Sequence, residues 1–297
     1  MSDISRRDFL GRSLAGLTTA LTVPHLLTET SAQRQIPAFL GPVRLGRTDI
    51  DVTRIALGLG SGGWEYTSQQ KKLGEARFLD LLQHAYDSGI RFLETADIYG
   101  THELTGKSWK YIPREKVTLL TKIWTRPNDW VRIENARTAV DRFRKELNTD
   151  KLDIVYVHCQ VSENWEEETK ALRDDLSELK QKGIIDAVGV SCHSYQALVQ
   201  AAKSDWVEVV QVRINPFEVR MDNSPEQIST LMKEMRISGK GVIGMKIFGA
   251  GHTASDIQRQ QSLEYVWKND LADSITLGMV SPAQVDDALM RVKEILA

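Results

Sequence analysis

Short apolar runs alternate along this chain with longer segments in which apolar positions recur at helical spacing, from residue 54 to the C-terminus. The short runs are rich in β-branched residues, which is typical of buried strands. Strands are predicted at 54–59, 91–94, 117–122, 152–158, 184–191, 207–213, 241–245 and 274–276. Helices are predicted at 75–88, 102–107, 133–147, 166–182, 194–201, 225–236, 254–269 and 282–296. This alternation predicts a single-domain α/β fold, the (β/α)8 TIM barrel.

Local signals support several of these boundaries. In Ser224-Pro225 and Ser281-Pro282 a hydroxyl suited to capping a helix precedes a proline suited to its first turn. Residues 43–54 alternate in polarity around a turn, which predicts a hairpin across the floor of the barrel.

The first 32 residues differ from the rest of the chain. Arg6 and Arg7 precede an apolar, uncharged stretch at 14–23, and small residues at 30–32 suit a signal peptidase. The stretch has no polar face, which argues against an amphipathic helix, and it is too short for a committed membrane span. We therefore expect a twin-arginine signal peptide at 1–32 and the barrel at 33–297.

This signal predicts recognition by the twin-arginine export machinery and a periplasmic location, whether the signal is cleaved or kept as an anchor. That machinery carries folded proteins, which suits a protein that acquires a cofactor in the cytoplasm. The chain has 297 residues, 41% hydrophobic and 26% charged, with a net charge of −2 and no basic block. Nucleic acid and acidic lipid are therefore not expected as main partners.

Polar side chains stand at the ends of successive predicted strands. Glu94, Lys122, His158 and Ser191 end the second to fifth strands, and Tyr99 follows Glu94 by five residues. Reacting groups of such barrels lie where the strands end and the following loops begin. A tyrosine, a lysine and a histidine gathered there can deliver a proton to a carbonyl oxygen, with a carboxylate holding the lysine, so an enzyme is predicted.

At these residues the chain resembles the aldo/keto reductase family. The segments VRLGRTDIDVTRIALG, ETADIYG, TK, VH, GVS and VVQVRINPF occur in the order and at the spacing of that family. The resemblance implies reduction of aldehydes and ketones by a nicotinamide dinucleotide. It makes Tyr99 the general acid, has Lys122 lower the phenol pKa, and has His158 orient the substrate oxygen. A carboxylate is expected to pair with Lys122.

That carboxylate departs from the family pattern, because Glu94 stands where the family has aspartate. The longer side chain keeps the charge and shifts the geometry. Asp97 lies beyond the strand end and out of register, so it is not expected to take over the pairing with Lys122.

The resemblance also implies cofactor contacts. Ser191 and Gln211 match the groups that hold the nicotinamide carboxamide, although Cys192 replaces an expected asparagine. Met245 takes the place of the aromatic residue on which the nicotinamide ring often stacks, and offers apolar contact without a π-face.

For the pyrophosphate, Gly249 and Gly251 allow close backbone approach, and the helix that starts at Ser281 offers N-terminal amides. Lys246 is expected to be the only positive charge nearby. Residues 277–288 contain no lysine or arginine to grip a 2′-phosphate, so NADP(H) and NAD(H) both remain open.

The glycine-rich segment 58–63 fits the spacing of a Rossmann phosphate loop. The polar and aromatic residues that follow continue as loop rather than helix, so we expect a flexible first loop instead. Gly63, Trp64, Trp124 and Phe217 are candidates for the substrate mouth, which suits a substrate with apolar or sugar-ring surface.

Cys159 and Cys192 each stand beside a histidine at a strand end. Free thiols, a disulfide, or a metal site with His158 and His193 are the alternatives. Strand alternation points His158 and Cys159 to opposite sides, which argues against the metal.

Reduction of a small aldehyde or ketone is the function that these residues favour. Two alternatives remain open: an exported non-catalytic barrel that binds a dinucleotide or a sugar, and a lyase or isomerase that acts on a sugar by proton transfer alone.

Overall fold

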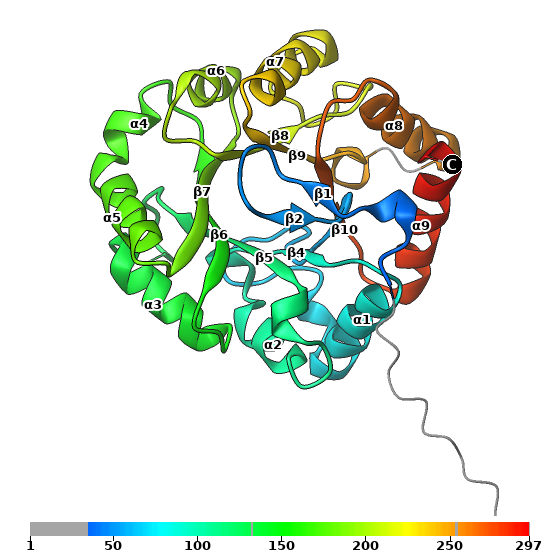
Figure 1. The fold of residues 1–297 in the computed structure, drawn as a ribbon, viewed down its shortest axis with the longest axis horizontal. Coiled ribbons are helices and arrows are strands. Elements are labelled where there is room, and N and C mark those ends of the chain that lie inside the picture. The colour runs from blue at the N-terminus through cyan, green and yellow to red at the C-terminus, as the bar shows by residue number, and fades with distance from the viewer. Residues whose placement is uncertain (1–34, 132, 253–254, 297) are drawn as a thin grey trace, which may run out of the picture. The chain divides into compact units, whose positions relative to one another are not determined.

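Eight parallel strands close into a barrel in the computed structural model, which describes residues 35–131, 133–252 and 255–296 (Figure 1). Neighbouring strands follow the order β10-β3-β4-β5-β6-β7-β8-β9. The strands are β3 Ile55–Gly58, β4 Phe92–Glu94, β5 Thr118–Trp124, β6 Leu152–Gln160, β7 Ile185–Cys192, β8 Val209–Arg213, β9 Gly241–Met245 and β10 Ser274–Gly278. The (β/α)8 barrel predicted from the periodicity is confirmed. The predicted signal peptide at 1–32 lies outside the described residues.

Helices surround the barrel (Figure 1). They are α1 Glu75–Asp87, α2 His102–Ser108, α3 Ala136–Glu146, α4 Trp165–Glu168, α5 Lys170–Gln181, α6 Tyr195–Lys203, α7 Pro225–Ile237, α8 Asp256–Lys268 and α9 Pro282–Leu296. Short 3-10 turns occur at Ala38–Leu40, Lys71–Leu73, Asp97–Tyr99, Arg114–Lys116 and Gly249–Gly251. Among the described helices, none has the length and apolarity needed to cross a bilayer.

Local hydrogen bonds explain where the helices differ from the prediction. Helix α3 begins at Ala136 rather than at 133, because the Asn135 side chain caps it by accepting from the Thr138 backbone N–H at 2.9 Å. The segment predicted as one helix at 166–182 is divided at Thr169, whose hydroxyl donates to the Trp165 carbonyl.

The predicted caps at Ser224 and Ser281 are present. The Ser224 hydroxyl accepts from the Gln227 N–H at 3.3 Å, and the Ser281 hydroxyl accepts from the Gln284 N–H at 3.4 Å.

A hairpin seals the end of the barrel at which the strands begin. Its strands are β1 Val43–Arg44 and β2 Asp51–Val52, and Figure 1 shows them in blue across this closed end of the barrel. Leu45 and Val52 pack against inward side chains of the barrel such as Ala56 and Phe92. Gly46 has φ +55°, and a Cβ there would lie 2.2 Å from the Gly241 nitrogen. The predicted hairpin floor is therefore confirmed, and the candidate site residues lie at the opposite end of the barrel.

Candidate active site

The side chains predicted for catalysis meet at the carboxyl ends of β4, β5 and β6. The Lys122 ammonium forms an ion pair with Glu94 and donates to the Thr95 carbonyl at 2.9 Å. It lies 4.9 Å from the centroid of the Tyr99 ring, and this ring stands edge-on to His158 with centroids 5.7 Å apart. The four residues therefore form one cluster.

The strand register explains this meeting. Glu94 on β4 pairs with Leu120 on β5, and Lys122 follows Leu120 by two residues. The side chains of Glu94 and Lys122 therefore point to the same face of the sheet. Trp124, two residues further, pairs with His158 on β6. Tyr99 reaches the cluster from the 3-10 turn that follows β4.

The ion pair is deeply buried, with Lys122 at 1% and Glu94 at 4% exposure. Burial lowers the pKa of the Lys122 ammonium well below its ordinary value, and the charge of Lys246 lowers it further. The carboxylate in contact with it is therefore the counter-charge that a buried ammonium requires. The glutamate makes the contact expected of the aspartate that it replaces.

Tyr99 and His158 are both held in their neutral forms. Burial raises the pKa of the Tyr99 phenol, and Cys159 and Asp97 raise it further. This direction is opposite to the expected effect of Lys122, whose charge is engaged by Glu94. Burial lowers the pKa of the His158 imidazole, with Lys122, His193 and Lys246 adding to the effect. A protonated phenol and a neutral imidazole can each donate one hydrogen bond to a carbonyl oxygen.

Asp97 has a structural task beside this cluster. Its carboxylate accepts from the backbone N–H groups of Ile98 at 2.7 Å and Trp124 at 3.0 Å, so it fastens the turn of Tyr99 to β5. As expected, it does not pair with Lys122. Burial raises its pKa to about 7.

The glycine-rich segment lies directly on Tyr99. A Cβ at Gly60 would come within 2.0 Å of one edge of the Tyr99 ring, and a Cβ at Gly63 within 2.2 Å of the other. Helix α1 starts only at Glu75, so the segment is a loop and not a Rossmann phosphate turn, as predicted. Gln70 holds this loop at Ser61 by accepting from the Ser61 N–H and donating to the Ser61 hydroxyl.

Four aromatic rings stand beside Tyr99 and His158. Trp64 meets Trp124 with centroids 5.4 Å apart and Trp130 with centroids 4.7 Å apart, and Tyr66 meets Trp130 at 5.7 Å. Trp124 stands edge-on to His158 at 5.3 Å. The candidate Phe217 makes no ring contact with any described residue. Sequence reasoning missed Trp130 and Tyr66 because they lie in loops without a periodic pattern.

The predicted carboxamide site contains an unpartnered polar atom. Ser191 and Gln211 are register neighbours on β7 and β8, and both are almost fully buried. Gln211 donates to the Thr276 hydroxyl at 3.1 Å, but its carbonyl oxygen is buried without a described partner. The Ser191 hydroxyl accepts from the Cys159 N–H at 2.8 Å. An amide group would satisfy the Gln211 oxygen.

Three of the residues predicted for the pyrophosphate lie in the turn after β9. Met245 ends β9, Lys246 has φ +58°, and the Gly249 N–H donates to the Lys246 carbonyl at 2.8 Å. Gly251 has φ +91°, and a Cβ there would meet no heavy atom within 4 Å. Ser281 follows a different strand, β10, and caps α9.

Lys246 is not the only positive charge in this region, so that expectation was wrong. Burial lowers the pKa of its ammonium, and Arg213 and Arg220 lower it further through their charges. Arg213 forms an ion pair with Asp222. Neither arginine was named as a candidate from the sequence. Arg213 ends β8, and Arg220 lies in the loop that follows it.

Both cysteines are free thiols and buried. Cys159 has φ +59°, and the pairing of β6 with β7 shifts register between Val157 and Gln160. This β-bulge breaks the alternation that was expected to send His158 and Cys159 to opposite sides. Cys159 instead packs with Ile98 and Trp124 on the side of the candidate site. No cluster of three metal-ligating side chains occurs among the described residues.

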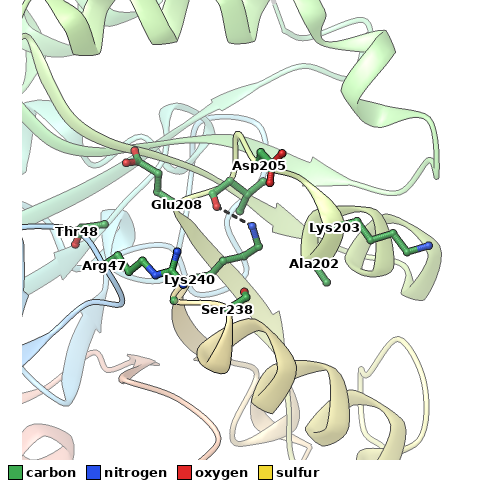
Figure 2. A pocket seen from close by; sticks show the side chains of 10 residues that line it. Arg47, Thr48, Ala202, Lys203, Asp205, Glu208, Ser238 and Lys240 are labelled. Atoms are coloured by element: carbon green, nitrogen blue, oxygen red, sulfur yellow. Dashed lines mark hydrogen bonds between the residues drawn. The ribbon is translucent and has the colours of Figure 1, made fainter.

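A hollow of about 310 Å³ lies at the other end of the barrel (Figure 2). It is lined by residues that precede β8 and β9 and by Arg47 and Thr48 of the hairpin. Its Lys240 ammonium donates to the Val207 carbonyl at 3.1 Å, and Asp205 and Glu208 balance its cations. It is therefore separate from the candidate site.

Comparisons with known proteins agree with this fold. The sequence model of a family described as "Aldo/keto reductase family" matches residues 58–291. The chain is 26% identical to Probable aldo-keto reductase 1 from Glycine max, over 76% of the chain and 66% of that protein. It is 30% identical to aldo-keto reductase YhdN from Bacillus subtilis (strain 168), over 60% of the chain and 54% of that protein. The chain thus spans less than two thirds of the length of these curated relatives.

Solved structures share the fold. Aldo-keto reductase AKR11C1 from Bacillus halodurans, in its holo form, superposes with a TM-score of 0.68 at 20% identity, over 84% of this chain and 90% of that one. The glycerol dehydrogenase AKR11B4 from Gluconobacter oxydans gives a TM-score of 0.62 at 18% identity, over 86% of this chain and 94% of that one.

The contact between Gly60 and Tyr99 predicts the outcome of a double-mutant cycle. Gly60→Ala should destabilise the protein by about 1 to 3 kcal/mol, because the new methyl group overlaps the Tyr99 ring. In a Tyr99→Ala background the same change should cost less than about 0.5 kcal/mol, since the ring is gone. Urea unfolding of the four proteins measures both values, and equal costs in the two backgrounds would contradict the contact.

Burial of Asp97 predicts a pH-dependent stability. The Asp97 pKa is about 7 in the folded protein and near its ordinary value in the unfolded protein. At pH values between these two pKa values, the folded state keeps a proton that the unfolded state has released. The free energy of unfolding therefore falls as pH rises through this range. Relative to Asp97→Asn, the parent protein should lose about 2 to 3 kcal/mol between about pH 5 and about pH 8. Urea titrations at several pH values measure this difference, and parallel pH profiles would refute it.

Proposed function

We infer that this chain, which belongs to the aldo/keto reductase family, reduces the carbonyl group of a small aldehyde or ketone with a nicotinamide dinucleotide, with Tyr99 as the general acid. The observation that carries this proposal is the cluster at the strand ends. There a phenol and an imidazole stand edge-on beside a buried lysine–glutamate ion pair.

Each member of the cluster has a role that its surroundings support. Tyr99 keeps its proton because burial raises the pKa of the phenol, and it gives the proton up when negative charge develops on the substrate oxygen. His158 is neutral and can donate a hydrogen bond to the same oxygen. Lys122 lies over the Tyr99 ring, where its charge stabilises the phenolate that remains after proton transfer.

Glu94 acts on this step through Lys122. Without a counter-charge, the buried ammonium would lose its proton and with it the ability to stabilise a phenolate. Glu94 is therefore a positioning residue rather than a group that touches the substrate.

The residues present fit a nicotinamide dinucleotide. When bound, NADPH or NADH supplies the hydride that the carbonyl carbon accepts. The unpartnered Gln211 oxygen and the Ser191 hydroxyl suit the carboxamide, and Met245 offers apolar surface to the ring. Lys246 and Arg220 provide positive charge for the phosphates.

The aromatic rings at the rim support a substrate with apolar or ring surface. Trp64 is 46% exposed and Tyr66 is 41% exposed, so both rings offer faces to a molecule that approaches Tyr99. Aldehydes and ketones that carry a flat or apolar group are therefore the proposed substrate class.

Tyr99→Phe tests the proposed general acid. The change should lower kcat for carbonyl reduction by about a hundredfold to ten-thousandfold, because no proton reaches the substrate oxygen. The Kd for NADPH and NADH, followed by nucleotide fluorescence, should change less than about threefold, since Tyr99 is not among the cofactor contacts.

Unchanged turnover in Tyr99→Phe would remove Tyr99 from the mechanism. Saturable nucleotide binding without turnover of any carbonyl compound by the parent protein would favour the non-catalytic barrel. Sugar conversion without net nucleotide consumption would favour the lyase or isomerase.

Glu94→Asp tests the ion pair. The shorter side chain withdraws the carboxylate from Lys122 by about one bond length, and displacements near 1 Å cost on the order of a hundredfold in rate. We expect kcat to fall by about tenfold to a hundredfold, with unchanged nucleotide affinity. Steady-state kinetics at saturating nucleotide measures the change, and a faster enzyme would show that the glutamate is a defect.

A further inference from the structure

A pocket of about 470 Å³ opens beside the catalytic cluster. It lies between the loop that follows β5 and the segment from the end of β6 to the start of α5. Its walls include Arg126, Cys159, Gln160, Val161 and Leu172.

Direct contacts join this pocket to the cluster. Cys159 lines the pocket and follows His158 in the chain, and its bulge turns it toward Trp124 and the Tyr99 turn. The Gln160 side chain donates to the His158 carbonyl at 2.8 Å and to the Thr125 hydroxyl at 3.0 Å. Cys159 and Gln160 therefore join the wall of the pocket to the cluster.

Arg126 is the charged group that the pocket leaves without a counter-ion. Its guanidinium lies 3.7 Å from the Cys159 sulfur and 5.8 Å from the centroid of the Trp124 ring. In the described part of the chain it forms no ion pair with a carboxylate.

Two of the three carboxylates that line the pocket pair with arginines outside it. Glu134 pairs with Arg142 at 2.7 Å, and Asp175 pairs with Arg137 at 2.9 Å. Glu168 accepts from the Ser162 hydroxyl at 2.6 Å and keeps its negative charge.

Charged groups around Cys159 change the pKa of its thiol. Burial raises the pKa of its thiol, the charges of Arg126 and Arg213 oppose that rise, and the charge of Asp222 adds to it. Because the Arg126 guanidinium lies beside this sulfur, it places a positive charge at the inner end of the pocket.

We propose that this pocket binds a carboxylate on the substrate, so that the preferred substrates are aldehydes or ketones that carry a carboxylate beyond an apolar or aromatic spacer. This inference rests on the proposed function and adds the substrate class. A guanidinium binds a carboxylate through two parallel hydrogen bonds, and Val161 and Leu172 contact the spacer.

Arg126→Gln tests the proposal with two substrates that share the same benzaldehyde core. The probes are 4-carboxybenzaldehyde and its uncharged counterpart, methyl 4-formylbenzoate. The parent protein should prefer the carboxylate, and Arg126→Gln should lower the ratio of kcat/KM for carboxylate over ester by about 30-fold, mainly through KM. Arg126→Lys, which keeps the charge but not the paired hydrogen bonds, should retain part of the preference.

Arg144→Gln is the matched control. It removes one positive charge from α3 at a residue that pairs with Asp141 and does not line the pocket, so the substrate ratio should stay unchanged. An unchanged ratio in Arg126→Gln would overturn the proposal. A weaker Kd for NADPH in Arg126→Gln with an unchanged ratio would also overturn it, by assigning Arg126 to the cofactor.

A binding measurement separates this proposal from the proposed function. Calorimetric titration with 4-(hydroxymethyl)benzoate needs no turnover, and Arg126→Gln should weaken its binding by about 30-fold. That result in a protein that reduces no carbonyl compound would support the pocket and reject the reductase. Equal binding by the two proteins, or no saturable binding by the parent, would reject the proposed pocket. Turnover of either aldehyde would uphold the proposed reductase activity in that case.

Discussion

A lysine inside a closed barrel needs a counter-charge, and the contact between Lys122 and Glu94 supplies it. The remainder of the candidate site is arranged around this pair. Thr95 adds a backbone acceptor for the ammonium, and the Tyr99 ring covers it from the loop side. Removing either charge would leave the other buried and unpaired, which costs several kcal/mol. The pair therefore ties the fold of β4 and β5 to the chemistry proposed at their ends.

The bulge at the end of β6 places Cys159 beside the cluster that contains this ion pair. An unbroken strand would send the side chain after His158 into the layer between strands and helices. The left-handed backbone at Cys159 turns it toward the rim instead, and the Ser191 hydroxyl secures the turn by accepting from the Cys159 N–H. As a result the thiol lines the pocket that also contains Arg126. One irregular residue thus connects the cluster of Tyr99 and His158 with the place proposed for the substrate's far end.

The fold and the cluster were predictable from the sequence because each depends on a periodic pattern. Apolar runs gave the strands, and the ends of parallel strands in a closed barrel meet at one rim, which brought Glu94, Lys122 and His158 together. The bulge at Cys159 was not predictable, since it depends on a register shift between two strands rather than on residue type. The role of Gly60 was also hidden. A glycine required by close approach to a ring has the same sequence signature as one required by a turn or a phosphate.

Burial is the main reason why the Tyr99 phenol and the His158 imidazole are neutral. Burial holds the proton on Tyr99, and burial together with neighbouring cations keeps His158 uncharged. Positive charge comes instead from Lys246 beyond β9 and from Arg126 beyond β5, on either side of the cluster. In the proposed reduction, the flanks offer positive charge to anionic groups, and the centre offers neutral donors to the carbonyl oxygen. Because charge would develop on that oxygen only during this reaction, donors beside a buried ammonium would favour the transition state more than the bound substrate.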